Sequence, residues 1–203
     1  MFIVEATAGR IPLGVNFLKK GFPVVLPTDT LYGICADALN YRAVEKIYQL
    51  KNRNPKKPLI VLISDLFQLK EFFFIRKLPK VVEQLFLLEE PLSIILPVEG
   101  FNWISRSSGK IAFRLVKKGF IKEFLDTYRR PIVAPSANWE GFPPAKDPFH
   151  ALFYFGNQVA VYYNGGTLKG EPSTLLELTP KGEINILRTG NPLTVEKVKS
   201  FLK

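Results

Sequence analysis

The sequence has few of the residues that build common catalytic and metal centres. It contains one cysteine, Cys35, and one histidine, His150. A single cysteine cannot form an intrachain disulfide, which favours a reducing compartment. One cysteine and one histidine also argue against a His/Cys zinc site and against Ser-His-Asp or Cys-His catalysis. We therefore expect no metal site built by the protein alone, and we interpret His150 as a surface or helix residue.

Long apolar runs are missing as well. The first ten residues, MFIVEATAGR, lack the basic start and apolar centre of a signal peptide. No apolar run reaches the length needed to cross a bilayer. We expect a soluble, cytoplasmic protein without a membrane partner.

Acidic residues are scarce relative to basic ones. Twenty-eight Lys and Arg residues against eighteen Asp and Glu residues give a net charge of +10. This excess favours an anionic partner such as a nucleotide, a nucleic acid or a phosphorylated metabolite, although many basic proteins bind no polyanion. A hydrophobic content of 47% excludes wholesale disorder, and 203 residues without a linker or repeat indicate one domain over residues 1–203.

Strand-like and helix-like segments alternate along most of the chain. Helical periodicity predicts helices over 9–20, 40–50, 79–89, 119–129 and 194–202, with Asn40 as the N-cap of the second. Short aliphatic runs predict buried strands over 22–27, 59–64, 92–97, 111–116 and 131–136. Three closely spaced strands follow over 159–164, 173–178 and 184–190, and their spacing suggests antiparallel pairing. The pattern predicts an α/β fold with a twisted mixed sheet and flanking helices, and a loop over 137–148.

The familiar nucleotide-binding motifs are absent, because neither G-x-x-x-x-G-K-[ST] nor G-x-G-x-x-G after a strand occurs. A phosphate site would have to be built from cations, hydroxyls and amides at strand ends. The first candidate is LPTDTLYG (26–33), where a strand delivers Thr28, Asp29, Thr30 and Tyr32 into a turn closed by Gly33. The alternative is a turn whose Thr and Asp side chains only satisfy local backbone groups.

The second candidate is KNRNPKKPLIVLIS (51–64), with Lys51, Arg53, Lys56 and Lys57 in its first seven positions. One or two of these cations could complement the dipole of the preceding helix. Four without an acidic neighbour favour a phosphate chain as their partner.

The third candidate is Arg114 in the strand KIAFRLV, where it should lie on the face opposite Ile111 and Phe113. A buried arginine needs either an acidic partner in the protein or a ligand carboxylate, and we favour the ligand. The fourth candidate combines PIVAPSANWEG, GEPSTLLEL and ILRTG. These segments supply hydroxyl, amide and guanidinium groups suited to an amino acid or a nucleotide. The residues are Ser136, Asn138, Ser173, Thr174 and Arg188.

In this order, the segments PTDTLYG, KNRNPKKPL, IAFRLV, PIVAPSANWEG, EPSTLLEL and LRTG closely resemble the YrdC-like family of L-threonylcarbamoyladenylate synthases. The resemblance covers almost the whole chain. It implies a twisted α/β fold around a basic concave cleft. It also implies a nucleotidyltransferase that joins L-threonine, bicarbonate and ATP into threonylcarbamoyl-AMP and pyrophosphate, for the t6A modification of tRNA by a downstream threonylcarbamoyl-transfer enzyme.

The resemblance also assigns roles to individual residues. L-threonine would be bound by Thr28, Arg114, Ala134 and Ser173. ATP would be bound by Lys51, Arg53, Ser136 and Arg188, with Mg²⁺ on its phosphates. The remaining matched positions would line the same cleft, and they are Thr30, Tyr32, Lys57, Asn138 and Thr174. No residue would act as a nucleophile, because carbamate formation and attack on the α-phosphate need positioning and charge neutralisation.

The chain departs from the family pattern at several positions. EEPLSIILP replaces a P-G-P-x-T segment, so that Ser93 would supply the hydroxyl, and Glu140 and Lys110 replace small hydroxyl residues. Asn54 stands where proline is usual. The chain also ends where the single-domain members end, so any lid given by a C-terminal domain would have to come from elsewhere. These changes affect the expected adenine and phosphate contacts.

Three other functions fit parts of the sequence. A non-catalytic RNA-binding module could use the same basic cleft and interleaved aromatics such as Tyr32, Phe72–Phe74 and Trp139. The EFFF stretch is, however, more typical of packing than of base stacking. A carbamoyl-transfer domain like that of hydrogenase-maturation enzymes is a second alternative, but those chains are longer and carry zinc-finger cysteines. A degenerate, non-catalytic relative is the third.

Overall fold

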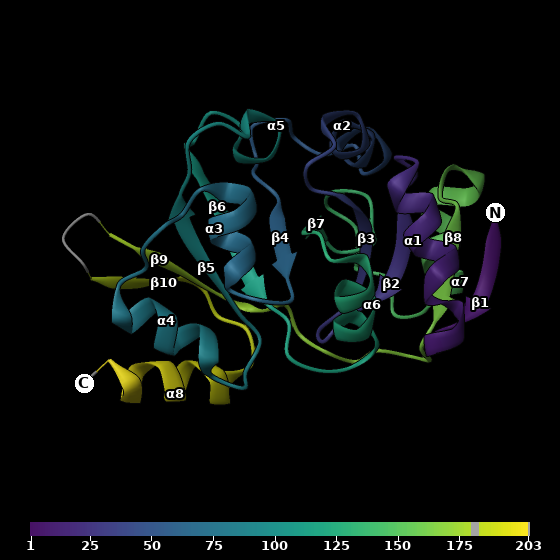
Figure 1. Cartoon of the computed structure of the whole chain (residues 1–203). Coiled ribbons are helices and arrows are strands. Elements are labelled where there is room, and N and C mark those ends of the chain that lie inside the picture. Colours follow the sequence, from purple (N-terminus) through teal and green to yellow (C-terminus); the bar gives the residue numbers. More distant parts are fainter. Residues whose placement is uncertain (180–182, 203) are drawn as a thin grey trace.

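A single mixed β-sheet runs through the molecule from one end to the other (Figure 1). The computed structural model describes residues 1–179 and 183–202. Its strands occur in the spatial order β1-β8-β2-β3-β7-β4-β6-β5-β9-β10. They are β1 (Phe2–Glu5), β2 (Val24–Pro27), β3 (Tyr32–Asp37), β4 (Ile60–Ile63), β5 (Leu92–Pro97), β6 (Lys110–Leu115), β7 (Ile132–Val133), β8 (Val161–Asn164), β9 (Thr174–Leu178) and β10 (Ile184–Arg188).

The helices lie between or after these strands, and the five that the sequence predicted end close to their predicted boundaries. They are α1 (Ile11–Lys19), α2 (Tyr41–Leu50), α3 (Phe67–Phe73), α4 (Lys80–Leu87), α5 (Asn102–Ser105), α6 (Phe120–Tyr128), α7 (Pro148–Phe155) and α8 (Pro192–Phe201), with 3-10 turns at Ala8–Arg10 and Gly156–Gln158. Asn40 caps α2 as predicted, since its side chain accepts a hydrogen bond from the Ala43 amide. The sequence did not predict β1, β3, α3, α5 or α7, and it extended β7 to residues 131–136.

One prediction about strand direction was wrong. The last three strands were expected to be antiparallel, and β9 and β10 do pair in that way. In contrast, β8 runs parallel to both β1 and β2. The helix α7 lies between the 137–147 loop and β8, so the chain crosses over before β8 enters the sheet.

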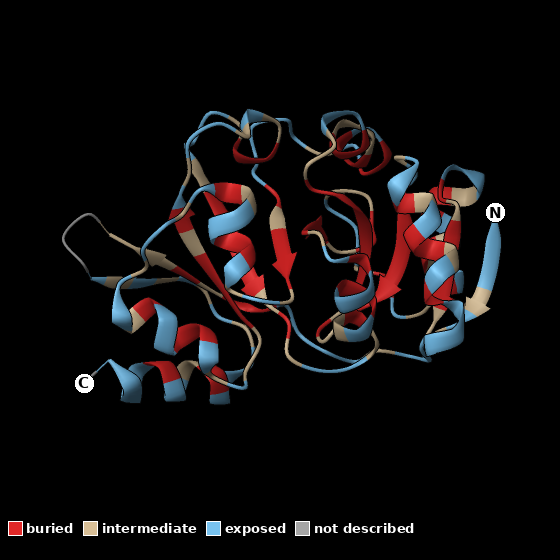
Figure 2. Ribbon diagram, viewed as in Figure 1, coloured by how far each residue is buried: buried red, intermediate tan, exposed pale blue. Residues whose placement is uncertain are grey.

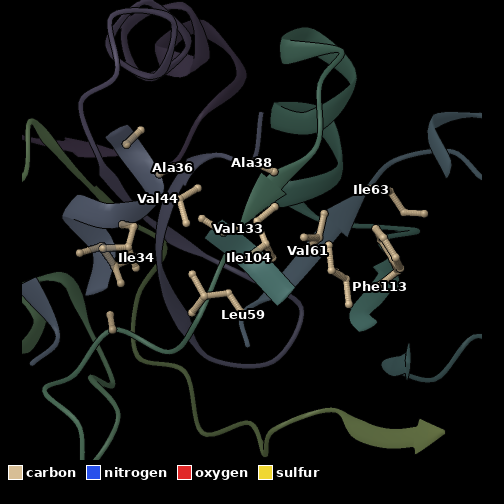
Figure 3. Close-up of a cluster of buried hydrophobic side chains, with 14 of the residues drawn as sticks. Ile34, Ala36, Ala38, Val44, Leu59, Val61, Ile63, Ile104, Phe113 and Val133 are labelled. Carbon is tan, nitrogen blue, oxygen red and sulfur yellow. The ribbon is translucent and has the colours of Figure 1, made fainter. Parts of the chain in front are cut away.

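The central strands separate two hydrophobic cores. Alternate residues of each strand point to opposite faces, so Val25 of β2 enters the larger core while Val24 and Leu26 enter the smaller one. Residues of α2, α3, α4, α5, α7 and α8 belong to the larger core, and residues of α1 and α6 belong to the smaller one. Figure 3 shows part of the larger core, in which Val44 of α2 lies near Ala36 of β3 and Val133 of β7, and Ile63 of β4 and Phe113 of β6 lie farther along the sheet.

Burial is greatest in the middle of the sheet and falls toward its edges (Figure 2). On β6 the aromatic ring of Phe113 is fully buried in the larger core, whereas Arg114, the next residue, points to the other face. On that face α1 and α6 cover only part of the sheet. The remaining part, over β4, β6, β5 and β9, is bordered by cavities whose walls contain strand and loop residues.

Candidate functional site

The turn between β2 and β3 places two threonine hydroxyls at one end of these interior strands. The Thr28 Oγ1 atom accepts hydrogen bonds from the amides of Thr30 (3.1 Å) and Leu31 (3.2 Å), and it donates to the Leu31 carbonyl. It also lies 3.0 Å from Thr30 Oγ1. Thr28 therefore satisfies local backbone groups, as the simpler interpretation of this turn expected. Both threonines nevertheless line a cavity.

Arg114 reaches this turn from β6 and is only 4% exposed. Its guanidinium donates to Thr30 Oγ1 (3.2 Å) and lies 3.1 Å from Asp29 Oδ1. The contact with Asp29 is an ion pair without hydrogen-bond geometry, and Arg114 Nε has no partner among the described residues. Asp29 is thus the acidic partner that the sequence left open, and one buried N–H of the guanidinium has no partner among the described residues.

A second arginine, Arg188, approaches from the end of β10. Its Nε and Nη2 atoms donate to the Ser173 carbonyl at 3.2 and 2.9 Å, and Nη2 also lies 3.2 Å from Ser173 Oγ. Ser173 Oγ is in turn 2.7 Å from Ser93 Oγ. Burial lowers the pKa of the Arg188 guanidinium, and the charge of Arg114 lowers it further. Because the two guanidinium charges repel each other in one cavity, an anion bound between them would be stabilised.

The SAN segment is held in place by Lys51 at the C-terminal end of α2. Lys51 is 1% exposed, and its Nζ atom donates to the carbonyls of Ser136 (2.5 Å) and Asn138 (2.6 Å). Burial, helped by the charge of Arg53 and opposed by Glu140, lowers the pKa of Lys51 to about 7. Because the amine is occupied by backbone carbonyls, Lys51 shapes the segment that carries Ser136.

Eight of the predicted site residues line one cavity of about 270 Å³. Its walls come from the β2–β3 turn, the middle of β6, the segment after β7, the segment before β9 and the end of β10. The eight residues are Thr28, Thr30, Tyr32, Arg114, Ala134, Ser136, Ser173 and Arg188.

A second cavity of about 440 Å³ adjoins the first and shares Ile60 and Arg188 with it. Arg53 lies in its wall, as does Lys110, whose Nζ atom is 2.8 Å from Glu177 Oε1. The sequence had marked Lys110 only as a departure from the family pattern, and it did not identify Glu177. The alternation of β6 was an available signal, because Lys110 and Arg114 are four residues apart and share a face.

The other four predicted residues line neither of the two cavities. Lys51 lies beneath the SAN segment, and Asn138 binds the carbonyls of Trp139 and Phe142 through its amide nitrogen. Thr174 accepts a hydrogen bond from the Gly190 amide. The fourth residue, Lys57, forms an ion pair with Glu140, whose carboxylate also accepts the Asn54 amide. The unusual Glu140 thus fixes the loop that carries the cations of residues 53–57.

The loop from 165 to 173 closes the cavity from one side. The Tyr32 hydroxyl donates to the Gly166 carbonyl (2.7 Å) and accepts the Gly165 amide (2.9 Å). At Gly170 a Cβ atom would lie 2.1 Å from the Thr30 carbonyl oxygen, so only glycine permits this approach. The buried Tyr32 ring fastens the loop and cannot stack on a base, contrary to its suggested part in RNA binding.

The described residues contain no cluster of three or more His, Cys, Asp or Glu side chains that could hold a metal ion. Within the same part of the chain, no helix is long and apolar enough to cross a bilayer. His150 is half-buried on α7 with its ring stacked on Tyr154, which agrees with its interpretation as a helix residue.

Sequence comparison finds relatives over nearly the whole chain. A threonylcarbamoyl-AMP synthase from Pyrococcus abyssi is 30% identical over 195 residues, which are 93% of this chain and 57% of that protein. A putative threonylcarbamoyl-AMP synthase from Mycobacterium tuberculosis is 30% identical over 98% of this chain and 91% of its own length. The chain therefore spans just over half of the first relative and nearly all of the second.

Structural comparison finds the same fold. Pyrococcus abyssi Sua5 complexed with L-threonine matches with a TM-score of 0.89 and 28% identity, over 100% of this chain and 62% of that one. Escherichia coli YciO matches with a TM-score of 0.80 and 21% identity, over 94% and 95% of the two chains, and this likeness concerns the fold alone. The family model Sua5_yciO_yrdC, described as telomere recombination, matches residues 16–190. The chain belongs to the Sua5/YciO/YrdC family.

Proposed function

We propose that this chain is an L-threonylcarbamoyladenylate synthase that converts L-threonine, bicarbonate and ATP into threonylcarbamoyl-AMP, pyrophosphate and water. The observation that carries the proposal is the 270 Å³ cavity, in which Arg114 and Arg188 face hydroxyls from three separate segments. The names of the two relatives and the threonine complex of Pyrococcus abyssi Sua5 support the proposal.

The smaller cavity would bind L-threonine. Arg114 lines this cavity and would bind the threonine carboxylate through its guanidinium, which Asp29 and Thr30 fix in place. Hydroxyls of Thr28 and Ser173 can hydrogen-bond the amine and hydroxyl of the substrate. The wall at Ala134 lacks a side chain long enough to fill this space, which leaves room for an amino acid.

The adjoining 440 Å³ cavity would bind ATP. Arg188 lies in the walls of both cavities, so its charge can face the α-phosphate beside the amino acid. Arg53 and Lys110 would face the nucleotide from the other side, and Ser136 would contribute a hydroxyl. Mg²⁺ would enter as part of the MgATP substrate. A direct contact between Lys51 and a phosphate remains a prediction, because the Lys51 amine is bound to two carbonyls.

The reaction requires positioning of the substrates and no protein nucleophile. The threonine nitrogen bonds to the bicarbonate carbon, and water and a proton leave to give a carbamate. A carbamate oxygen then attacks the α-phosphorus, and the bond to the pyrophosphate leaving group breaks. Bringing the two anions together is what Arg114 and Arg188 would contribute, because fixed cations neutralise the charge that develops on the phosphates.

The threonylcarbamoyl group of the product is activated as a mixed anhydride, so a separate transfer enzyme would pass it to tRNA to form t6A. The direct test is pyrophosphate release by the purified chain. We expect release from MgATP only when both L-threonine and bicarbonate are present, together with a threonylcarbamoyl-AMP species detected by mass spectrometry. Pyrophosphate release that is independent of threonine, or no release, would contradict the proposal.

A further inference from the structure

Ser93 is a fully buried polar residue on β5 that lines neither of the two cavities of the candidate site. Its position follows from the register of the sheet. Ile94 pairs with Phe113 of β6, and both side chains enter the larger core. Because successive side chains of a strand point to opposite faces, Ser93 and Arg114 share the other face. On its other side β5 pairs with the parallel strand β9, which begins directly after Ser173 (Figure 1).

The Ser93 hydroxyl has one hydrogen-bond partner within the described part of the chain. Its Oγ atom lies 2.7 Å from Ser173 Oγ. Ser173 is also buried, with 2% exposure, but it lines the 270 Å³ cavity. Its Oγ atom lies 3.2 Å from Arg188 Nη2, which can only donate. Ser173 Oγ therefore lies between a serine behind the cavity wall, an arginine and the cavity itself.

The partners of these atoms determine which serine donates. A hydroxyl has one hydrogen to donate and can accept two hydrogen bonds. If Ser173 donated to Ser93, the hydrogen of the Ser93 hydroxyl would be buried without an acceptor, which is costly. If Ser93 donates, its hydrogen is satisfied, and Ser173 Oγ accepts from both Ser93 and Arg188. The second arrangement is therefore favoured.

This arrangement directs the hydrogen of the Ser173 hydroxyl into the cavity. Both acceptor positions of Ser173 Oγ are filled, so this hydroxyl can only donate to a ligand. The guanidinium groups of Arg114 and Arg188, which line the same cavity, are donors as well. A donor in this place fits an acceptor oxygen of an amino acid, and it does not fit an ammonium group.

We propose that Ser93 is a positioning residue of the candidate active site, which donates to Ser173 Oγ and thereby directs the Ser173 hydrogen toward an oxygen atom of bound L-threonine. Ser93 acts through Ser173, because it lines neither cavity itself. This inference rests on the proposed function, since it assigns the 270 Å³ cavity to L-threonine. The alternative is a purely structural role, in which the contact only holds β5 beside the segment that precedes β9.

A pair of isosteric variants isolates the Ser93 hydroxyl. Ser93→Thr keeps the donor, and Ser93→Val replaces it with a methyl group of similar size. Because both variants add similar bulk at a fully buried position, a difference between them reports on the hydroxyl. Ser93→Ala adds no bulk and provides the result if neither larger side chain is accommodated. Ser105→Ala is the control for loss of a buried serine hydroxyl, since Ser105 lies on α5 and lines neither cavity.

Isothermal titration calorimetry measures the Kd for L-threonine, and pyrophosphate release measures the KM for ATP. The Kd for L-threonine should rise about 5- to 20-fold in Ser93→Val and Ser93→Ala, because the Ser173 hydrogen is no longer directed at the ligand. Ser93→Thr and Ser105→Ala should stay within about 3-fold of the wild-type Kd. The KM for ATP should change by less than about 3-fold in all four variants.

A double-mutant cycle tests whether the effect passes through Ser173. Ser173→Ala should itself weaken threonine binding, because the donor in the cavity wall is lost. Adding Ser93→Ala to that variant should change the Kd by less than about 2-fold, since the acceptor of the Ser93 hydroxyl is already gone.

Four outcomes would overturn the proposal. The first is that Ser93→Val and Ser93→Ala bind L-threonine as tightly as Ser93→Thr. The second is that Ser93→Ala weakens binding equally with and without the Ser173 hydroxyl, and the third is an equal rise of the KM for ATP. The fourth is that the wild-type chain does not bind L-threonine. Threonine binding without pyrophosphate release would contradict the synthase activity alone, so failure of the proposed function and failure of this inference can be told apart.

Discussion

The candidate active site uses its cations in the opposite way to the basic end, a surface at the ends of α1 and α6 and on α2 that consists of Lys19, Lys20, Arg42, Lys46, Arg129 and Arg130. At the active site the cations are buried or held by partners, as in the pairs Arg114–Asp29 and Lys110–Glu177. At the basic end, five of six cations are unpaired among the described residues, and four of these five are exposed. Cationic side chains that are held by partners have a fixed orientation and can recognise one small anion. Unpaired cationic side chains on the surface attract any extended anion. Net charge alone therefore could not locate the site.

The largest effect is expected when Arg114 loses the fixed orientation of its guanidinium. Arg114→Lys keeps the charge beside Asp29 but loses the planar set of donors. We expect the KM for L-threonine to rise by about 10- to 100-fold, while the KM for ATP changes by less than about 3-fold. Steady-state pyrophosphate release with each substrate varied in turn provides the measurement. Equal rises in the KM for L-threonine and the KM for ATP would contradict the assignment of Arg114 to the threonine site.

The next effect concerns the buried amine of Lys51. Lys51→Met leaves the carbonyls of Ser136 and Asn138 without their donor, so the free energy of unfolding should fall by about 2 kcal/mol. The matched control is Lys56→Met at an exposed position of the same loop, which should change it by less than about 0.5 kcal/mol. Urea unfolding monitored by circular dichroism measures both. Similar losses in the two variants would show that Lys51 does not support the SAN segment.

A smaller effect is expected at the Lys110–Glu177 pair in the second cavity. Lys110→Ser removes a cation, and the KM for ATP should rise by about 3- to 10-fold. Glu177→Gln removes the opposing carboxylate, so the same KM should stay equal or fall. The KM for threonine should not respond to either change. If both variants raise the KM for ATP alike, the pair acts by holding β6 and β9 together.

The smallest effect should come from the exposed ion pair of Glu140 and Lys57. The hydrogen bond from Lys57 and the Asn54 amide lower the pKa of the Glu140 carboxyl below its ordinary value of 4.5. The pair therefore stabilises the fold above that value and is lost as pH falls through the lowered pKa. Glu140→Gln should cost less than about 1 kcal/mol at pH 7, and its difference from wild type in urea unfolding should shrink and disappear as pH falls through the lowered pKa. A difference that persists in acid would show that packing is responsible.

Much of the fold could be predicted from the sequence, because long periodic segments determine their own structure. The N-cap at Asn40 and the alternation around Arg114 were predicted and confirmed. The direction of β8 was not, since it depends on a crossover through α7, whose apolar sequence PFHALFYF has little helical periodicity. The strand β3 was also missed, because its first residues, Tyr32 and Gly33, were assigned to the turn that follows β2.

The site was predictable as a set of residues, and less so as a geometry. The motifs identified eight residues that line one cavity, including Thr28 and Arg188, which are 160 positions apart. The cations at 51–57 were expected together in a phosphate cradle. Lys51 instead lies in a carbonyl pocket and Lys57 pairs with Glu140. A run of like charges in sequence does not show which members are buried, because that depends on distant segments such as 136–140.

The position of the last two strands has a consequence for how the protein matures. Pro172, Ser173 and Arg188 complete a cavity whose other walls are formed by residues 28–144. A chain still emerging from the ribosome therefore lacks this wall until the residues of β9 and β10 have emerged. Because β9 must dock beside β5 across a long sequence separation, closure of the pocket belongs to the late, slow phase of folding. A nascent chain should accordingly be unable to bind amino acid until residues 172–188 have left the ribosome.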